Sequence, residues 1–199
     1  ADVVFSHKTG GDVDETLKAV PVDRDDRNQA IGPMQSIQAC TTFTFPGRNS
    51  KYSNLTWTGQ HFDSVHHNLL QPDDSKIYGT KPKTFETELN HYYGSEEFQL
   101  ACAIDTDHPT VQEELKRWGE WIVDTTGIDG FRFEGANHVR PTFFSEWLAH
   151  VRRYARRKLF AVGDYWAEDV EALHSFISRT GGQLALFDVP LHYNFHRAS

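Results

Sequence analysis

The order of apolar and polar residues divides the chain into two parts that differ in periodicity. After Asp107, apolar residues recur at helical spacing and predict three helices, over about 111–122, 141–153 and 170–178. Short apolar runs alternate with these helices and predict three strands, over 128–133, 159–162 and 184–189. Such alternation is typical of βα units that form a parallel sheet. Because the run at 159–162 is uniformly apolar, we expect both faces of this sheet to be covered.

The first part of the chain has a different pattern. Residues 1–5 form an apolar run that predicts a further strand, and a chain that opens inside such a run is expected to start within a fold. Residues 6–103 lack helical periodicity and contain many Gly and Pro turn signals, with aromatic alternations at 41–45 and 55–57 that predict short antiparallel strands. We therefore expect residues 1–5 and 104–199 to form an α/β domain, and residues 6–103 to be a long irregular or β-rich insertion after its first strand.

Composition and charge exclude several classes of protein. The chain has 199 residues, 38% of them hydrophobic, and a formal net charge of −8. This apolar content is ordinary for a globular protein and excludes wholesale disorder. No window approaches the roughly 18 consecutive apolar residues of a membrane-spanning helix, so we expect no membrane partner. A net negative charge repels phosphate backbones, which argues against nucleic acid as the main partner.

The two cysteines and the first residues add little about cellular location. Cys40 and Cys102 are too few for a disulfide framework or a Cys-based zinc site, and their spacing leaves open whether they are free or bridged. Residues 1–30 show no charged-then-apolar leader, so no signal peptide is visible.

The candidate chemistry lies at the ends of the predicted strands. Glu134 and Asp164 follow two successive strands, and the carboxyl ends of parallel strands in an α/β barrel converge on one face. Arg132 lies two residues before Glu134, on the same side of the strand, where it can hold a carboxylate ionised. A carboxylate pair beside Tyr165 and Trp166 suits cleavage of a glycosidic bond, with one acid as nucleophile and the other as proton donor. The competing interpretation is that each acid is a solvated loop residue or a helix N-cap.

Motifs at these positions and elsewhere carry a family resemblance. The segments involved are residues 2–7, 25–29, 45–48, 61–63, 104–109, 127–138, 160–166 and 186–192. They resemble the α-amylase family of glycoside hydrolases, and in particular its bacterial liquefying members, in the same order along essentially the whole chain. The resemblance implies a partial (β/α)8 TIM barrel that covers strands three to six, with the insertion usually called domain B after the first strand present.

The resemblance also implies an activity and a set of site residues. The activity is endo-hydrolysis of α-1,4-glucosidic bonds in starch or maltooligosaccharides, with retention of configuration and an α-glucan as substrate. Glu134 matches the nucleophile, Asp164 the acid/base and Arg132 the positioning arginine. The substrate-binding positions are His7, Asn137, His138 and Trp166. Because the liquefying members are usually secreted, the resemblance implies an extracellular location.

Several departures from the family pattern bear on activity. The nucleophile is Asp in the family and Glu134 here, and the acid/base is Glu in the family and Asp164 here. The family's third catalytic carboxylate belongs to strand seven, which this sequence does not match. Asn137 stands where the family has a lysine that contacts sugar. We therefore expect weak hydrolysis; the alternative is a catalytically inactive α-glucan-binding or structural fragment.

The resemblance implies a calcium site that is weakened in this chain. Its candidate ligands are Asp63, Glu86, Glu97, Asp105, Asp107 and the backbone carbonyl of His138. Hard oxygen ligands of this kind suit Ca²⁺, although a solvated acidic face is the competing interpretation. Glu86 and Glu97 replace aspartates, and Ala103 replaces a liganding aspartate, so we expect weaker calcium binding than in the family.

Four strands of an eight-stranded barrel leave open edges and an exposed inner face. Three explanations stay open. Two copies could pair as a homodimer that completes a barrel, the insertion could cover the open face of a monomer, or the chain could be a fragment.

Overall fold

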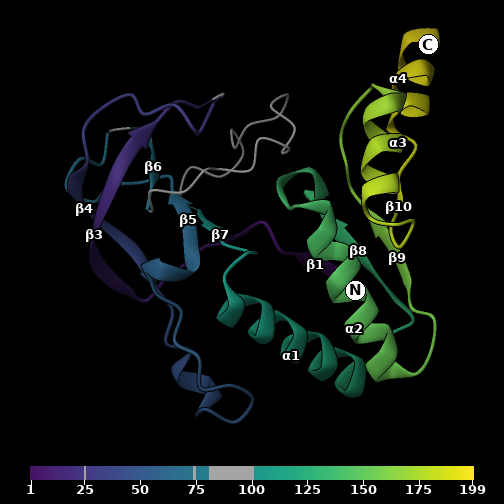
Figure 1. Cartoon of the computed structure of the whole chain (residues 1–199), viewed down its shortest axis with the longest axis horizontal. Coiled ribbons are helices and arrows are strands. Elements are labelled where there is room, and N and C mark those ends of the chain that lie inside the picture. The colour runs from purple at the N-terminus through teal and green to yellow at the C-terminus, as the bar shows by residue number, and fades with distance from the viewer. Residues whose placement is uncertain (25, 74, 81–100) are drawn as a thin grey trace. The chain divides into compact units, whose positions relative to one another are not determined.

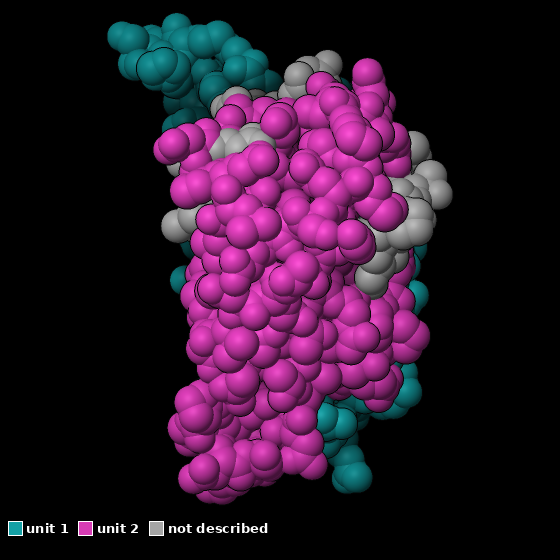
Figure 2. Space-filling model, turned by 90° about the vertical axis from the view of Figure 1, so that its left-hand side faces the viewer, with its two compact units in different colours: residues 1–6, 115–199 teal, residues 7–114 magenta. Residues whose placement is uncertain are grey.

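The computed structural model describes residues 1–24, 26–73, 75–80 and 101–199. The chain divides into two compact units, coloured separately in Figure 2. Unit 1 contains residues 1–6 and 115–199, and unit 2 contains residues 7–114.

Unit 1 is built on a four-stranded parallel sheet with the strand order β1-β8-β9-β10. Its strands are β1 (Asp2–Val4), β8 (Gly130–Glu134), β9 (Phe160–Gly163) and β10 (Ala185–Leu186). The helices are α1 (Pro109–Thr126, which begins in unit 2), α2 (Pro141–Ala155), α3 (Val170–Arg179) and α4 (Val189–Ala198). Helices and strands alternate along this part of the chain, as Figure 1 shows from the teal to the yellow segments. The predicted α/β class, a partial barrel with a β-rich insertion after the first strand, is confirmed.

An aromatic core lies on one face of the parallel sheet. Trp147 of α2 is fully buried, and its ring centroid lies 5.0 Å from those of Phe5 and Phe131 and 5.7 Å from that of Phe133. The indole Nε1 donates a hydrogen bond of 2.8 Å to the carbonyl of Leu115 in α1. Because side chains alternate along a strand, these buried aromatic residues share the face that α1 and α2 cover.

The opposite face of the parallel sheet is exposed in this chain. Val4 is 41% exposed and Phe160 is 63% exposed, although both belong to strands. The prediction that the run at 159–162 is covered on both faces is therefore wrong. The apolar run satisfies the period of a strand, but only the residues that point toward the helices have neighbours to bury them.

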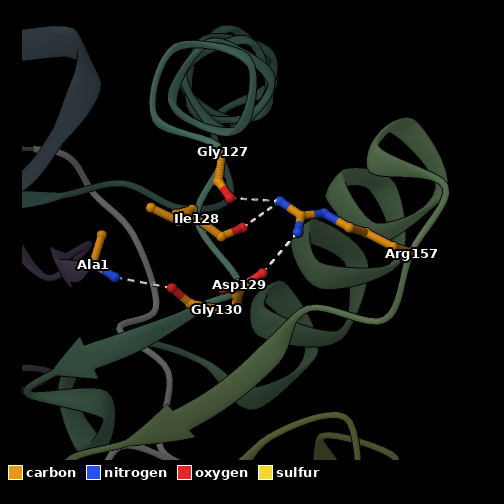
Figure 3. A network of polar contacts seen from close by, with 6 residues as sticks. All are labelled: Ala1, Gly127, Ile128, Asp129, Gly130 and Arg157. Carbon is orange, nitrogen blue, oxygen red and sulfur yellow. Dashed lines mark hydrogen bonds and ion pairs between the residues drawn. The ribbon is translucent and has the colours of Figure 1, made fainter.

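Arg157, just beyond the C-terminal end of α2, holds the segment that leads into β8 (Figure 3). Its guanidinium donates to the carbonyls of Gly127 (3.0 Å) and Ile128, and pairs with the Asp129 carboxylate at 2.8 Å. On the other side of the strand start, the amino group of Ala1 donates to the carbonyl of Gly130 at 2.9 Å. Arg157 is therefore a structural contact that holds the start of β8.

Helix α4 corrects the predicted strand over 184–189. The strand β10 ends at Leu186, and α4 begins at Val189. The Asp188 carboxylate accepts a hydrogen bond from the Leu191 N–H at 3.0 Å, and Pro190 occupies the first turn. An N-cap acid followed by Pro is a helix start signal, and it takes precedence over the apolar run.

Unit 2 is a β structure with the strand order β2-β7-β5-β6-β3-β4. Its strands are β2 (His7–Lys8), β3 (Val13–Val22), β4 (Gln35–Thr42), β5 (Phe62–Val65), β6 (Ile77–Gly79) and β7 (Cys102–Ile104). The pairings are antiparallel, as predicted, with β3 and β4 forming the longest pair. The predicted short strand at 55–57 is a single bridge between Phe43 and Trp57.

Polar contacts join distant parts of unit 2. The Glu15 carboxylate accepts hydrogen bonds from the Thr41 hydroxyl at 2.6 Å and from the Gly59 N–H at 2.7 Å. The two cysteines are free thiols, and the Cys102 Sγ lies 3.6 Å from the Cys40 carbonyl. Burial raises the pKa of Cys102 to about 12, so this thiol stays protonated and unreactive at neutral pH.

The compact units do not have the bounds predicted for the domains. Residues 104–114 cluster with unit 2, whereas the sequence grouped them with the α/β part. The division into 1–5 with 104–199, and 6–103, stays a prediction about domains. No helix in the described part of the chain is long and apolar enough to cross a membrane.

Candidate active site

Glu134 and Asp164 lie at the same edge of the parallel sheet. Glu134 is the last residue of β8, and Asp164 follows the last residue of β9. The Asp164 N–H donates to the Phe133 carbonyl at 2.7 Å, and the Asp164 carbonyl accepts from the Ala136 N–H at 3.0 Å. These two backbone hydrogen bonds tie Asp164 to Phe133, directly before Glu134, and to Ala136, two residues after it. The two acids are therefore neighbours at the carboxyl ends of adjacent strands, as expected from the sequence.

Arg132 connects Glu134 to a residue that sequence reasoning did not single out. The guanidinium Nη2 lies 3.5 Å from Glu134 Oε2, and its Nε lies 2.9 Å from Asp2 Oδ1. The parallel register pairs Asp2 of β1 with Arg132 of β8, so alternation brings all three side chains to one face of the sheet. Arg132 thus lies between two carboxylates, and its guanidinium contacts both of them.

The exposure of this ion-pair chain limits its strength but suits a role in binding. The side chains of Asp2, Arg132 and Glu134 are 69%, 40% and 51% exposed. Solvent screens charges at such positions, so the contacts orient the side chains more than they stabilise the fold. Asp2 belongs to a segment that carries the family resemblance, but only the strand register shows that it meets Arg132.

Asn137 and His138 belong to a short 3-10 turn, Ala136–His138, that follows β8. Gly135 precedes this turn with a φ of 61°, a left-handed conformation that glycine adopts without strain. The Asn137 amide lies 3.2 Å from the Nε2 of His138, and Asn137 is only 5% exposed. The structure therefore places Asn137 against the histidine ring, with little of its own surface open to a sugar.

Trp166 lies two residues after Asp164, in the loop between β9 and α3, and is 44% exposed. Its neighbour Tyr165 is 6% exposed, with its ring centroid 5.0 Å from that of Phe176. Tyr165 therefore packs into unit 1 while Trp166 stays accessible. An exposed indole offers an apolar face on which a sugar ring can stack, and this one lies two residues from Asp164 in the sequence.

His7 belongs to unit 2, where it lies half-buried in β2 and pairs with Ala103 of β7. Its predicted contact with substrate stays a prediction, because Glu134 and Asp164 belong to unit 1.

The predicted calcium ligands are only partly described. Glu86 and Glu97 lie outside the described residues, and Asp63, Asp105 and Asp107 belong to unit 2. Asp105 is 1% exposed, and its Oδ1 accepts hydrogen bonds from the N–H groups of Asp107 (3.0 Å) and His108 (3.1 Å).

The described acids do not by themselves form a metal site. Burial lowers the pKa of Arg27, and the nearby Asp63 carboxylate partly offsets this effect, so Asp63 interacts with a cation of the protein. Within the described ranges, no group of three or more His, Cys, Asp or Glu side chains could hold a metal ion. Calcium needs about six to eight oxygen ligands, more than these residues supply. The predicted ligand set, which includes His138 of unit 1, stays a prediction.

The parallel sheet, the crossover helices, the acids at adjacent strand ends and the β-rich insertion define a segment of an α/β barrel protein. No protein-family model matches the sequence. All of this chain is similar to the α-amylase of Geobacillus stearothermophilus, with 43% identity over 201 residues, which is 36% of that protein. It is also similar throughout to the α-amylase of Bacillus licheniformis, with 39% identity and 38% of that protein covered. A third relative is the cytoplasmic α-amylase of Escherichia coli, at 32% identity with 41% covered.

The chain belongs to the α-amylase family. It spans about two-fifths of the length of these curated relatives. A solved α-amylase from Malbranchea cinnamomea is 15% identical, with 96% of this chain and 30% of that chain covered at a TM-score of 0.45. That likeness is too weak to assign a fold, so the fold assignment rests on the strand order and register of this chain.

Proposed function

We propose that the chain carries an α-amylase-type active site that hydrolyses internal α-1,4-glucosidic bonds in starch and maltooligosaccharides with retention. The observation that carries this proposal is the placement of the two acids. Asp164 is hydrogen-bonded through its backbone to the residue before Glu134, and Arg132 lies 3.5 Å from Glu134. The names of the relatives support the substrate class.

Each residue has a defined task in the proposed reaction. The Glu134 carboxylate attacks the anomeric carbon while Asp164 protonates the departing glycosidic oxygen, which leaves a covalent glucosyl–enzyme intermediate. Asp164 then removes a proton from water, which hydrolyses the intermediate and restores both groups. Arg132, whose Nη2 lies 3.5 Å from Glu134 Oε2, orients the Glu134 carboxylate for this attack.

We expect turnover to be low. Glu134 is one methylene longer than the family aspartate, and Asp164 is one methylene shorter than the family glutamate. Displacement of a reacting group by about 1 Å can reduce the rate about a hundredfold. The combined reach of the two side chains is unchanged, so a substrate that binds slightly off the family position would recover part of the geometry.

The alternative proposal is a chain that binds α-glucan without hydrolysing it. The exposed Trp166 supports binding independently of the acids. A structural fragment with no glucan affinity is a third possibility, and it predicts no retention of the chain on a starch affinity gel.

The first experiment is release of reducing sugar from soluble starch by the purified chain, beside Glu134→Gln and Asp164→Asn. Asp164→Asn removes the general acid, which lowers the rate by roughly 10²–10⁴-fold, and Glu134→Gln removes the nucleophile, so both variants should be almost inactive. Glu146→Gln is the matched control, because Glu146 is an exposed residue of α2 and should leave the rate unchanged. Equal activity in all four proteins would identify a contaminating amylase and would contradict the assignment of the acids.

We also propose a calcium site weaker than the family norm. Ala103 cannot supply the side-chain oxygen of the family aspartate, and this loss lowers the number of charged ligands. Calorimetric titration with Ca²⁺ should show weak uptake, and tight stoichiometric binding would contradict the proposal.

A second copy of the chain is the proposed partner that covers the open face of the parallel sheet. The exposed side chains of Val4 and Phe160 support this, as do the edge strands β1 and β10, each of which pairs with one described neighbour. Light scattering should give twice the chain mass, and a clean monomer would exclude the pair. An extracellular location stays a proposal, since the E. coli relative is named a cytoplasmic α-amylase.

A further inference from the structure

The loop that carries Asp164 and Trp166 is attached to α4 at two points. The Trp166 Nε1 donates a hydrogen bond of 3.0 Å to the hydroxyl of Tyr193. Two residues further along the loop, the Glu168 carboxylate pairs with Arg197 at 2.9 Å. Both partners belong to α4, which the sequence pattern did not predict.

Aromatic rings of α4 flank the indole. The His192 ring centroid lies 5.3 Å from that of Trp166 with an interplanar angle of 55°, and the Tyr193 ring centroid lies 6.3 Å away at 66°. His192 and Tyr193 contact each other at 5.5 Å. The indole is therefore held at its N–H and beside its ring, while 44% of the residue stays exposed. This is a fixed aromatic surface rather than a freely rotating side chain.

We propose that Tyr193 is a positioning residue that holds Trp166 as a platform for one glucose ring of an α-glucan, beside the acid Asp164. The proposal deepens the proposed function and rests on it. The apolar face of a hexopyranose ring stacks on an indole, and a ring held in advance loses less conformational freedom when the sugar binds. The hydrogen bond from the indole N–H to Tyr193 favours this one rotamer of Trp166. Without that acceptor, the N–H would favour other rotamers in which it reaches water.

The proposal predicts a specific loss when the Tyr193 hydroxyl is removed. Tyr193→Phe keeps the ring contact but removes the acceptor of the Trp166 hydrogen bond. A typical hydrogen bond contributes enough to change an equilibrium constant about 3- to 10-fold, so the dissociation constant for maltoheptaose should rise by about that factor. Trp166→Ala should weaken binding by more than about tenfold, since it removes the platform itself.

Matched controls exist in unit 1. Trp121 of α1 is 37% exposed, and Tyr154 of α2 is 43% exposed with its hydroxyl bonded to Asp124. Trp121→Ala and Tyr154→Phe remove the same groups elsewhere, so both variants should bind maltoheptaose like the wild type.

Two further readouts separate positioning from a loss of folding. In Tyr193→Phe the NMR resonance of the Trp166 indole N–H should move, while the other indole resonances stay in place. If starch is hydrolysed, KM should rise by the same factor as the dissociation constant, with kcat unchanged. A fall in kcat alone would overturn the positioning role.

The outcomes distinguish this proposal from the proposed function. Wild-type chain that binds maltoheptaose, with Tyr193→Phe binding equally well, would refute the role of Tyr193 and leave the glucan-hydrolase proposal intact. Wild-type chain that neither binds maltoheptaose nor hydrolyses starch would refute both. Hydrolysis that depends on Glu134 but not on Trp166 would refute the platform alone.

Discussion

Gly119 of α1 gives a test in which helix propensity and tertiary packing predict opposite signs. Gly119 is buried in the interior of a helix, where alanine is more favourable than glycine by about 1 kcal/mol. In the structure, however, a Cβ at Gly119 would lie 2.6 Å from Trp147 Cζ2 and 2.6 Å from Val151 Cγ2. Real carbon contacts of this kind are about 3.5–4.0 Å, so both side chains would have to move.

Trp147 has little freedom to move. It is fully buried among Phe5, Phe131 and Phe133, and its indole N–H is bonded to the Leu115 carbonyl. Overpacking a core in this way lowers the free energy of unfolding by about 1–3 kcal/mol. Because the Trp147 ring is held rigidly, we expect a loss toward the upper end of that range. After the gain in helix propensity is subtracted, Gly119→Ala should lower the free energy of unfolding by about 1–2 kcal/mol.

Urea unfolding followed by tryptophan fluorescence measures this change, with thermal unfolding as a second probe. For a chain of this size the melting temperature should fall by about 2–8 °C. Thr125→Ala is the control, because Thr125 is exposed in the same helix and its replacement should stabilise slightly through helix propensity. A Gly119→Ala variant as stable as the wild type, or more stable, would contradict the close packing of α1 against Trp147 and Val151 of α2.

Two further predictions concern pH and the ion-pair chain. His67 accepts a hydrogen bond from the Cys40 N–H at 3.0 Å, and burial lowers its pKa although the Asp14 carboxylate acts in the opposite direction. As the pH falls, the unfolded chain therefore binds a proton at His67 before the folded chain does. Stability present above pH about 6.5 should be lost as the pH falls toward the folded-state pKa. The urea midpoints of wild type and His67→Gln should converge at low pH, and curves of midpoint against pH that stay parallel would contradict this. Asp2→Asn should lower kcat about tenfold with little change in KM, because Arg132 loses the partner that holds it beside Glu134. Equal rates of starch hydrolysis would rule out that role.

The elements with a strong local period could be predicted from sequence. The predicted helices at 111–122, 141–153 and 170–178 correspond to Pro109–Thr126, Pro141–Ala155 and Val170–Arg179. Apolar residues at helical spacing produce this signal without knowledge of the partner. The placement of Glu134 and Asp164 at adjacent strand ends was also predictable, since parallel strands present their carboxyl ends at one edge.

Other features of the candidate site could not be predicted from local pattern. The predicted strand over 184–189 extended to Val189, where α4 in fact begins, and no helix was predicted after it. The position of Tyr193 on α4, and its hydrogen bond with Trp166, therefore could not be predicted. Asp2 meets Arg132 only because β1 and β8 pair in one particular register. A shift of one residue would turn every side chain of the strand to the other face.

The sequence by itself thus determined the βα alternation, the β-rich insertion, the family and the pair of acids. Tertiary structure decided which acid Arg132 meets besides Glu134, which ring holds Trp166, and which sheet face is buried. The physical reason is the range of the interactions. Periodicity and capping act within a few residues and are written in the local sequence, whereas register and packing join residues far apart in the chain.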